Sequence, residues 1–249
     1  MERVAVVTGA SSGIGAEIAR ALSGRGWVCV LVARREERLR ALAGEIGGEA
    51  EVCDVADRGA VDAMADRVTR RHPLIHLLVN NAGIPARSNF IDGDPAAMEA
   101  AMQVNYFGGI WCLRAFLPAL EAAAPSDVVN IVSVAGDVAF PPSGPYSASK
   151  HAQLAFSRAT AAQLRRRGIR VHTIKPGFVE TEGFPQSGLP VPVRRFVVGP
   201  DVVAAHVLSS LDRGRGESSV PRYYGLAGRI QALIPNTFAR VLGFSRGRT

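Results

Sequence analysis

Tyr146 and Lys150 are the pair of side chains in this sequence with the clearest capacity for chemistry. They stand four residues apart, so in a helix they lie on one face, one turn apart. A phenol has a pKa of about 10, too high for easy proton exchange near neutrality, and a nearby ammonium group lowers it. Tyr146 could then give a proton to a carbonyl oxygen or accept one from an alcohol. Ser133, at the end of an apolar run, could hold that oxygen by a hydrogen bond.

The elements that must position these side chains follow from an alternation along the chain. Short apolar runs predict buried strands at 4–7, 28–32, 50–53, 77–79, 128–132 and 171–174. Between and after them, helical spacing predicts helices at 14–23, 36–46, 59–70, 96–122, 147–166 and 201–211. This pattern predicts an α/β fold, a single doubly wound Rossmann-type domain over residues 1–249. Its sheet would be parallel, with helices on both faces, because the strand runs are continuously apolar.

A glycine-rich turn follows the first predicted strand. Residues 8–15 read TGASSGIG and lead into a helix, an arrangement in which glycines let the backbone approach a pyrophosphate at the helix N-terminus. The G-xxx-G-x-G spacing departs from the common G-x-G-xx-G fingerprint. At the end of the second strand, Ala33 stands where an acidic residue would bind the ribose of NAD, and Arg34 and Arg35 follow it. Guanidinium groups favour the 2′-phosphate of NADP(H) instead, although Arg35 could also begin a solvated helix.

Further motifs occur at the ends of the later strands and in the predicted helices. They are Asp54-Val55, Asn80-Asn81-Ala82-Gly83, Asn105, Ser133, Tyr146-Ser-Ala-Ser-Lys150 and Pro176-Gly177-Phe178-Val179-Glu180-Thr181. Together with the glycine turn, these motifs in this order resemble the short-chain dehydrogenase/reductase family over roughly residues 3–182.

The resemblance implies a set of site residues. The catalytic residues would be Asn105, Ser133, Tyr146 and Lys150, with Asn105 holding a water in the proton path and Lys150 also bonding the nicotinamide ribose. The cofactor contacts would be Gly9, Ser11, Ser12, Gly13, Ile14, Gly15, Arg34, Arg35, Asp54, Val55, Asn81, Ala82, Gly83, Tyr146, Lys150, Pro176, Gly177, Val179 and Thr181. The histidines show no metal-ligand spacing, so no metal site is expected.

The expected function is hydride transfer between NADP(H) and a carbonyl/alcohol pair. The family's substrate loop would fall at residues 183–200, and its apolar side chains favour a lipophilic ketone or aldehyde, unless they only pack the loop. These are Phe184, Leu189, Val191, Val193, Phe196, Val197 and Val198. One alternative is a 3-oxoacyl-thioester reductase. Another is a non-catalytic dinucleotide-binding sensor or scaffold, which the intact Ser133, Tyr146 and Lys150 disfavour.

Composition bounds these expectations. The 249 residues are 47% apolar and 20% charged, which suits a globular domain with a sizeable core and excludes a disordered chain. Three cysteines cannot build a disulfide scaffold, and no apolar run approaches the length of a membrane span. The expected compartment is the reducing cytoplasm.

The net charge of +7 is unevenly distributed. Residues 1–182 hold 20 basic and 19 acidic groups, whereas residues 183–249 hold 9 arginines and 3 acids. A nearly neutral body disfavours nucleic acid as a partner. The tail at 220–249 carries the basicity, and within 220–244 apolar residues alternate with Arg222, Arg229 and Arg240. Docking on the body or on a partner subunit, and contact with an anionic membrane surface, both stay open for this tail. By resemblance, the chain would form a homodimer or homotetramer through helices 96–122 and 147–166.

Overall fold

A sheet of parallel strands runs through the protein, which the computed structural model describes for residues 2–86, 89–188, 194–237 and 240. Within these residues the strand order is β3-β2-β1-β4-β5-β6-β7, and every neighbouring pair is parallel. The chain therefore reverses its direction of winding between β1 and β4. The carboxyl ends of the strands at such a switch point form the usual binding crevice of an open α/β sheet. The strands are β1 (Arg3–Thr8), β2 (Trp27–Ala33), β3 (Glu49–Val52), β4 (Leu77–Asn80), β5 (Ser126–Ile131), β6 (Ile169–Pro176) and β7 (Glu217–Val220).

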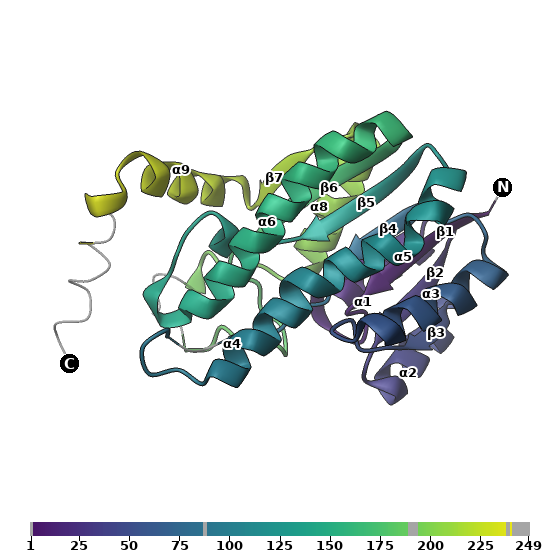
Figure 1. The fold of residues 1–249 in the computed structure, drawn as a ribbon, viewed down its shortest axis with the longest axis horizontal. Coiled ribbons are helices and arrows are strands. Elements are labelled where there is room, and N and C mark those ends of the chain that lie inside the picture. Colours follow the sequence, from purple (N-terminus) through teal and green to yellow (C-terminus); the bar gives the residue numbers. More distant parts are fainter. Residues whose placement is uncertain (1, 87–88, 189–193, 238–239, 241–249) are drawn as a thin grey trace.

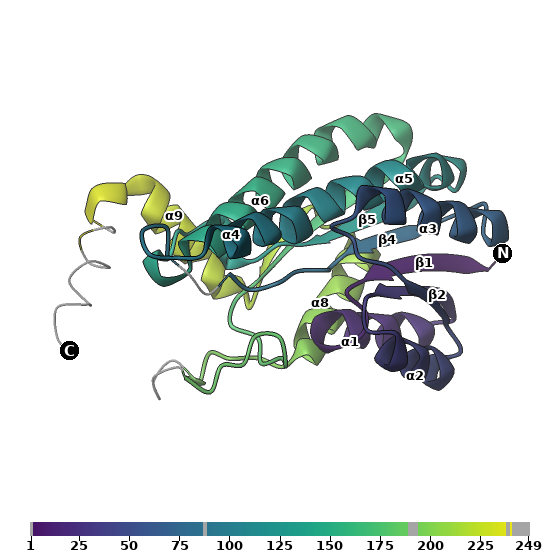
Figure 2. The same cartoon turned by 60° about the horizontal axis from the view of Figure 1, so that its bottom comes forward.

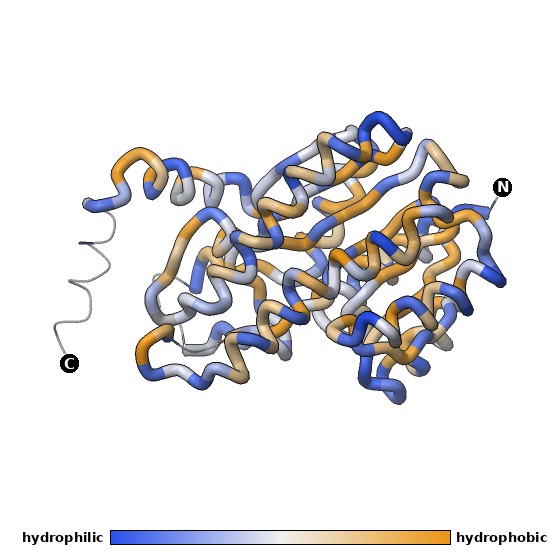
Figure 3. The backbone as a smooth tube through the Cα atoms, viewed as in Figure 1, coloured by the Kyte–Doolittle hydropathy of each residue, from blue (hydrophilic) through white to orange (hydrophobic). Residues whose placement is uncertain are grey.

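Helices cover both faces of the sheet (Figure 2). One face carries α1 (Gly13–Ser23), α2 (Glu36–Ile46) and α8 (Pro200–Arg213), and the other carries α3 (Arg58–Arg71), α5 (Gly108–Ala122) and α6 (Gly144–Leu164). Each face has its own apolar core, and the two cores meet the sheet from opposite sides. The strands at the centre of the sheet, β1, β2 and β4, are almost continuously apolar because both of their faces are buried (Figure 3). The predicted Rossmann-type α/β fold is confirmed.

Three local features differ from the sequence prediction. The helix predicted at 96–122 is α4 (Pro95–Met102) and α5, joined by a π-helical turn at Gln103–Phe107. The helix predicted at 147–166 begins at Gly144, which places Tyr146 in its first turn. The strand β7 was not predicted because its sequence, ESSV, is short and mostly polar. It forms by pairing with β6, from Thr173 opposite Glu217 to Pro176 opposite Val220.

The end of the described chain leaves the sheet. A 3-10 turn at Arg222–Tyr224 leads into α9 (Gly225–Leu233), which stands clear of the sheet (Figure 1). The helix α9 ends at Leu233, and residues 235–237 are helical again. Among the described helices, none is long and apolar enough to cross a membrane.

A partly buried ion-pair network ties β6 and β7 to the loop after β5. Lys175 Nζ lies 2.6 Å from Asp137 Oδ2 and 2.7 Å from Glu217 Oε1. Arg158 Nη2 lies 2.8 Å from Glu217 Oε1. The hydrogen bond from Arg158 and, beyond it, the bond from Lys175 hold the pKa of Glu217 at about 2, against the opposing effect of burial. The carboxylate is therefore stabilised in its ionised form in the folded protein.

Replacing Glu217 with glutamine should lower the free energy of unfolding near neutrality and have a smaller effect in acid. The folded pKa of about 2 lies below the ordinary 4.5, so the stabilisation is present above pH 4.5 and is lost as the pH falls toward 2. Urea unfolding of wild type and Glu217→Gln across this range tests the prediction. A difference between the two proteins that stays constant with pH would contradict it. Glu36→Gln, at an exposed pair with Arg40, is the control and should change stability by about 0.5 kcal/mol or less.

Candidate active site

The turn between β1 and α1 brings the backbone against the end of β4. Gly9 and Gly13 have φ values of +67° and +56°, which residues with side chains rarely adopt. A Cβ atom on Gly15 would lie 2.4 Å from both Asn81 Nδ2 and the Gly9 carbonyl oxygen. Positions 9 and 13 require glycine because of their positive φ angles, and position 15 requires it because there is no room for a Cβ atom.

Thr8 and Asn81 brace this turn against β4. Thr8 Oγ1 donates to the Val79 carbonyl at 3.1 Å and accepts from the N–H groups of Asn81 at 3.0 Å and Ala82 at 3.1 Å. Asn81 Nδ2 donates to the carbonyls of Thr8 at 2.9 Å and Gly9 at 3.3 Å. Asn81 and Ala82, both predicted cofactor contacts, are thus part of the support of the turn.

The N-terminus of α1 is suited to an anion. Ser12 precedes the helix and makes no capping hydrogen bond to it, and the first turn contains no acidic residue. The N–H groups of this turn and the helix dipole therefore favour a phosphate group. Gly13 faces Thr181, whose Cγ2 would lie 3.1 Å from a Cβ atom at position 13, and Ile14 packs against the core. The turn fits the pyrophosphate of a dinucleotide.

The two arginines after β2 take different partners. Arg34 Nη1 donates to Asp54 Oδ2 at 3.4 Å, away from the glycine turn. Arg35 lies across the turn: its Nε donates to Ser11 Oγ at 3.1 Å, and its Nη2 donates to Ser12 Oγ. Arg35 thus occupies the position beside the turn that a phosphate-binding side chain needs.

Asp54 and Val55 lie just beyond β3. Asp54 Oδ1 accepts the N–H of Ala56 at 3.0 Å, which shapes the loop. Val55 is buried, and a Cβ atom on Gly108 would lie 2.8 Å from its Cγ2. Val55 therefore holds α5 close to the loop, which places the π-helical turn and Asn105 beside the end of β4.

Tyr146, Ser133 and Lys150 come together at the carboxyl end of β5. Lys150 Nζ lies 5.8 Å from the centre of the Tyr146 ring and donates to the Ile131 carbonyl at 3.1 Å and to Gln153 Oε1 at 2.7 Å. The Ser133 side chain lies near the Tyr146 phenol and acts to lower its pKa. Ser133 Oγ also accepts the N–H of Ala135 at 3.1 Å. The phenol of Tyr146, the hydroxyl of Ser133 and the amine of Lys150 therefore lie together at one end of the sheet.

Asn105 connects three elements around this group. Its Oδ1 accepts the Ile84 N–H at 2.8 Å, and its Nδ2 donates to the Ile84 carbonyl at 3.0 Å and to Ser149 Oγ at 2.9 Å. Both hydrogens of the side-chain amide are thus engaged in hydrogen bonds. A water in a proton path could therefore donate to an oxygen atom of Asn105 but could not accept from its amide group. A Cβ atom on Gly83 would lie 3.2 Å from Asn105 Oδ1 and 3.6 Å from Lys150 Nζ, so glycine lets these groups approach.

The pKa values of the pair differ from the expectation that an ammonium group lowers the pKa of the phenol. Burial raises the pKa of Tyr146 to about 12, although the Ser133 hydrogen bond acts in the other direction. Burial also lowers the pKa of Lys150 to about 7, because the residue is only 4% exposed. A partly neutral amine supplies little positive charge to the phenol. The expected lowering of the Tyr146 pKa is therefore not produced by these residues alone.

The segment after β6 completes the site. The Gly177 N–H donates to the Val220 carbonyl at 2.8 Å, and a Cβ atom on Gly177 would collide with the Tyr224 ring, 2.1 Å from Cε2. Pro176 is the last residue of β6, and its carbonyl oxygen lies 3.5 Å from Ser133 Oγ. Val179 is buried and forms a β-bridge with Val198. Beyond it, the Phe184 ring lies 5.5 Å from the Tyr146 ring. Leu189, Val191 and Val193, also expected in the substrate loop, lie outside the described residues.

Sequence reasoning missed several contributors to the site. Thr8 begins the TGASSGIG motif, but its hydrogen bonds go to Val79 and Ala82, which are 71 and 74 residues away in the sequence. Ser149 lies within the Tyr-Ser-Ala-Ser-Lys motif, and Gln153 stands one turn after Lys150, so spacing could have identified both. Tyr224 and Glu182 carry no signal in the sequence, because their partners are brought to them by the fold.

The fold and these groups define a dinucleotide-binding enzyme, and comparison with known proteins agrees. The family model for short chain dehydrogenases matches residues 3–188. An uncharacterized oxidoreductase of Staphylococcus saprophyticus is 36% identical over 186 residues, 72% of this chain and 80% of that protein. A bovine 3-oxoacyl-[acyl-carrier-protein] reductase is 34% identical over 73% of this chain and 78% of its own length. Bovine dehydrogenase/reductase SDR family member 7B is 34% identical over 72% of this chain, but the match spans only 58% of its length.

Solved structures show the same fold with either dinucleotide. A short-chain dehydrogenase from Burkholderia cenocepacia in complex with NADP has a TM-score of 0.81 and 31% identity, covering 94% of this chain and 96% of that one. A short-chain dehydrogenase/reductase from Burkholderia phymatum in complex with NAD has a TM-score of 0.84 and 25% identity, covering 95% of each chain. The chain belongs to the short-chain dehydrogenase/reductase family and is an NAD(P)-dependent oxidoreductase.

Gly15→Ala should destabilise the protein and weaken dinucleotide binding, because the new methyl group has no room between Asn81 and the Gly9 carbonyl. We expect a loss of about 1–3 kcal/mol in the free energy of unfolding. Gly44→Ala is the matched control: it lies inside α2, nothing lies within 4 Å of a Cβ atom there, and the change should stabilise by about 0.5–1 kcal/mol. Chemical denaturation measures both. Equal stabilities of the two variants would show that the turn is not tightly packed.

Proposed function

We propose that this protein transfers hydride between NADP(H) and a carbonyl/alcohol pair of a lipophilic ketone or aldehyde. The observation that carries the proposal is the convergence of Tyr146, Ser133 and Lys150 at the strand ends beside a glycine turn suited to a pyrophosphate. A bound dinucleotide would supply the hydride. The protein's own residues would supply binding, orientation and the proton.

Tyr146 is the proposed proton donor and acceptor. Ser133 would hold the substrate oxygen, since it lies at the end of β5 near the Tyr146 phenol. Lys150 would support the proton transfer and bond the nicotinamide ribose, and Asn105 would keep the loop after β4 and α6 in register. With a pKa of about 12, Tyr146 carries its proton near neutrality and could donate it to a carbonyl oxygen, but so high a pKa makes it a weak acid until positive charge lies beside it. The reverse direction needs added positive charge to favour the phenolate.

The preference for NADP(H) would come from Arg35. Its guanidinium group lies against Ser11 and Ser12 at the turn, where a 2′-phosphate beside the adenine ribose could form charge-assisted hydrogen bonds. Glu182 competes for the same group, because its carboxylate lies 3.5 Å from Arg35 Nη1 and also pairs with Arg38. The neighbouring arginines lower the pKa of Glu182, so this carboxylate stays charged near neutrality. The structure therefore supports a preference for the phosphorylated cofactor that Glu182 moderates.

The lipophilic substrate is proposed from the apolar side of the loop at 183–200. Phe184 packs beside Tyr146, and Phe196 packs edge-on against Tyr223 at 5.7 Å between ring centres. A 3-oxoacyl thioester is the second candidate, because a relative of this chain is named as a reductase of such a substrate. A panel of ketones, aldehydes, steroids and acyl thioesters, followed by NADPH absorbance, separates the two.

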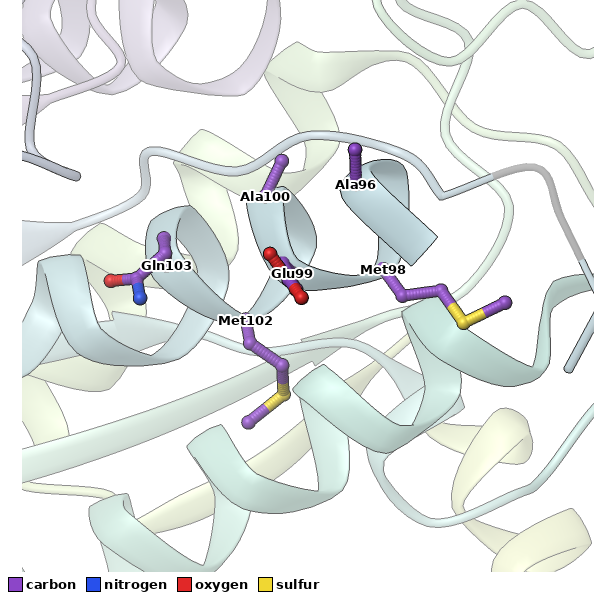
Figure 4. A pocket seen from close by; sticks show the side chains of 6 residues that line it. All are labelled: Ala96, Met98, Glu99, Ala100, Met102 and Gln103. Carbon is purple, nitrogen blue, oxygen red and sulfur yellow. The ribbon is translucent and has the colours of Figure 1, made fainter. Parts of the chain in front are cut away.

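A homo-oligomer is proposed through the outer faces of α4, α5 and α6. A hollow of about 510 Å³ lies along α4, lined by Ala96, Met98, Glu99, Ala100, Met102 and Gln103 (Figure 4). None of these is a candidate site residue. Small and flexible apolar side chains on an open helix face suit contact with another subunit. Sedimentation velocity would measure the state of assembly.

Tyr146→Phe should abolish most of the ketone-dependent oxidation of NADPH while leaving cofactor binding intact. The change removes only the hydroxyl, and loss of a general acid lowers kcat by about 100-fold or more. Binding of NADPH, followed by fluorescence, should stay within about twofold because no phosphate-binding group changes. Unchanged turnover would contradict the proposed role of Tyr146, whereas a wild type that binds NADPH but turns over no carbonyl of the panel would leave a dinucleotide-binding sensor as the better account.

Arg35→Gln should raise the Kd for NADPH and leave that for NADH nearly unchanged. Removal of charge-assisted hydrogen bonds to one phosphate should lower the affinity for NADPH by about tenfold to hundredfold. Arg40→Gln is the matched control, since Arg40 lies on α2 and pairs with Glu36, away from the turn. Glu182→Gln should act in the opposite direction and tighten NADPH binding. Equal losses of NADPH and NADH affinity in Arg35→Gln would exclude a role in reading the 2′-phosphate.

A further inference from the structure

The helix α9 meets the body through its small and polar face. A Cβ atom on Gly228 would lie 2.5 Å from Asp137 Cβ, and one on Gly225 would lie 3.1 Å from Ser219 Oγ. The N–H of Ala139 donates to Gln231 Oε1 at 3.0 Å. Residues 225, 228 and 231 are three apart and therefore share one side of the helix. This side is held close to the body, and glycine is what allows the approach.

The opposite side of α9 is apolar and open to solvent. Leu226, Ile230 and Leu233 recur at the spacing of one helical stripe and are 59%, 39% and 81% exposed, and Ile234 follows at 48%. A surface helix ordinarily turns such a stripe toward the core. Here the stripe faces away, on an element that stands clear of the sheet in both views (Figures 1 and 2). An exposed apolar stripe of this kind marks a surface for interaction.

The chain segment that carries this stripe has charges of one sign. From Ser218 to the end of the chain the sequence has five arginines and no aspartate or glutamate. In the described part of this segment, Arg222, Arg229 and Arg240 are all exposed. Arg229 lies in α9 itself, next to Ile230 in sequence. Phe238, Val241, Leu242 and Phe244, which extend the apolar and basic pattern in the sequence, lie outside the described residues.

We propose that α9 lays its outward apolar face on an anionic lipid surface. Apolar side chains would enter the acyl boundary while the arginines meet the headgroup phosphates. The same sign of charge disfavours pairing of α9 with α9 of a second copy, because Arg229 of each would approach its counterpart with no acid between them. The inference concerns binding alone and does not depend on the proposed reaction.

One site on the body could compete for this helix from a second copy. Phe90 and Ile91 are 62% and 91% exposed and lie beside Asp92 and Asp94. This loop offers apolar and acidic groups together, but only two carboxylates against the five arginines of the segment. A lipid surface of many phosphates matches the tail better, and docking in a second copy becomes one outcome of the test.

Co-sedimentation of the full chain with vesicles tests the proposal. Vesicles of phosphatidylcholine with phosphatidylglycerol should bind the protein, vesicles of phosphatidylcholine alone should bind it weakly, and added salt should weaken binding. Arg222→Gln with Arg229→Gln should lower partitioning about 25-fold, since each arginine near an anionic surface contributes about fivefold. Leu226→Ser with Leu233→Ser should lower it by about tenfold or more while all charges remain.

Two matched double variants serve as controls. Arg40→Gln with Arg58→Gln removes the same charge from α2 and α3, and Val52→Ser with Val202→Ser removes two exposed apolar side chains elsewhere. Both should bind as wild type does, and circular dichroism with a Tm for every variant shows that each is folded. The proposal is overturned if wild type binds neither vesicle type, or if Leu226→Ser with Leu233→Ser binds undiminished. It is also overturned if that variant instead dissociates an oligomer in sedimentation velocity without lipid, and Ile91→Ser does the same.

Discussion

The site depends on a single close approach, that of the glycine turn to the end of β4. No side chain fits at position 15, because Asn81 and the Gly9 carbonyl already occupy the space. Thr8 and Asn81 hold the two segments together by hydrogen bonds at the point where the order of strands reverses. This contact sets the position of the α1 N-terminus relative to the strand ends. The proposed pyrophosphate site and the proposed proton-transfer groups are thereby placed at the same edge of one sheet.

Burial governs the chemistry of the groups at that edge. Tyr146 and Lys150 stand one turn apart in α6, yet their pKa values move in opposite directions because the neutral form of each is favoured away from water. The neutral phenol carries the proton that a carbonyl oxygen would take, and positive charge brought beside it would lower its pKa and ease the transfer. Asn105 lies in the π-helical turn, and its side-chain amide donates hydrogen bonds to the Ile84 carbonyl and to Ser149 Oγ. These bonds hold the loop after β4 against α6.

Within the described residues, the segment after β7 contacts the candidate site only through its first turn, and α9 lies away from the site. Tyr224 covers Gly177, so the first turn after β7 packs on the segment expected to hold the nicotinamide. Gly228 then lies against Asp137, a member of the ion-pair network that includes Lys175, the residue before Pro176. Whatever meets the outward face of α9 therefore acts on an element linked, through Asp137 and Lys175, to the segment after β6.

The sequence by itself determined the alternation of strands and helices, the glycine turn and the spacing of Tyr146 and Lys150, because local periodicity and turn chemistry express these directly. It predicted most strands and helices to within a few residues. It could not reveal β7, which exists only as a partner of β6, or the π-helical turn that divides a continuous apolar pattern. Tertiary structure alone decided that Arg35, not Arg34, lies over the glycine turn, that burial reverses the expected pKa of Tyr146, and that α9 turns its apolar face outward. These outcomes depend on which distant segments meet, and neither spacing nor composition carries that information.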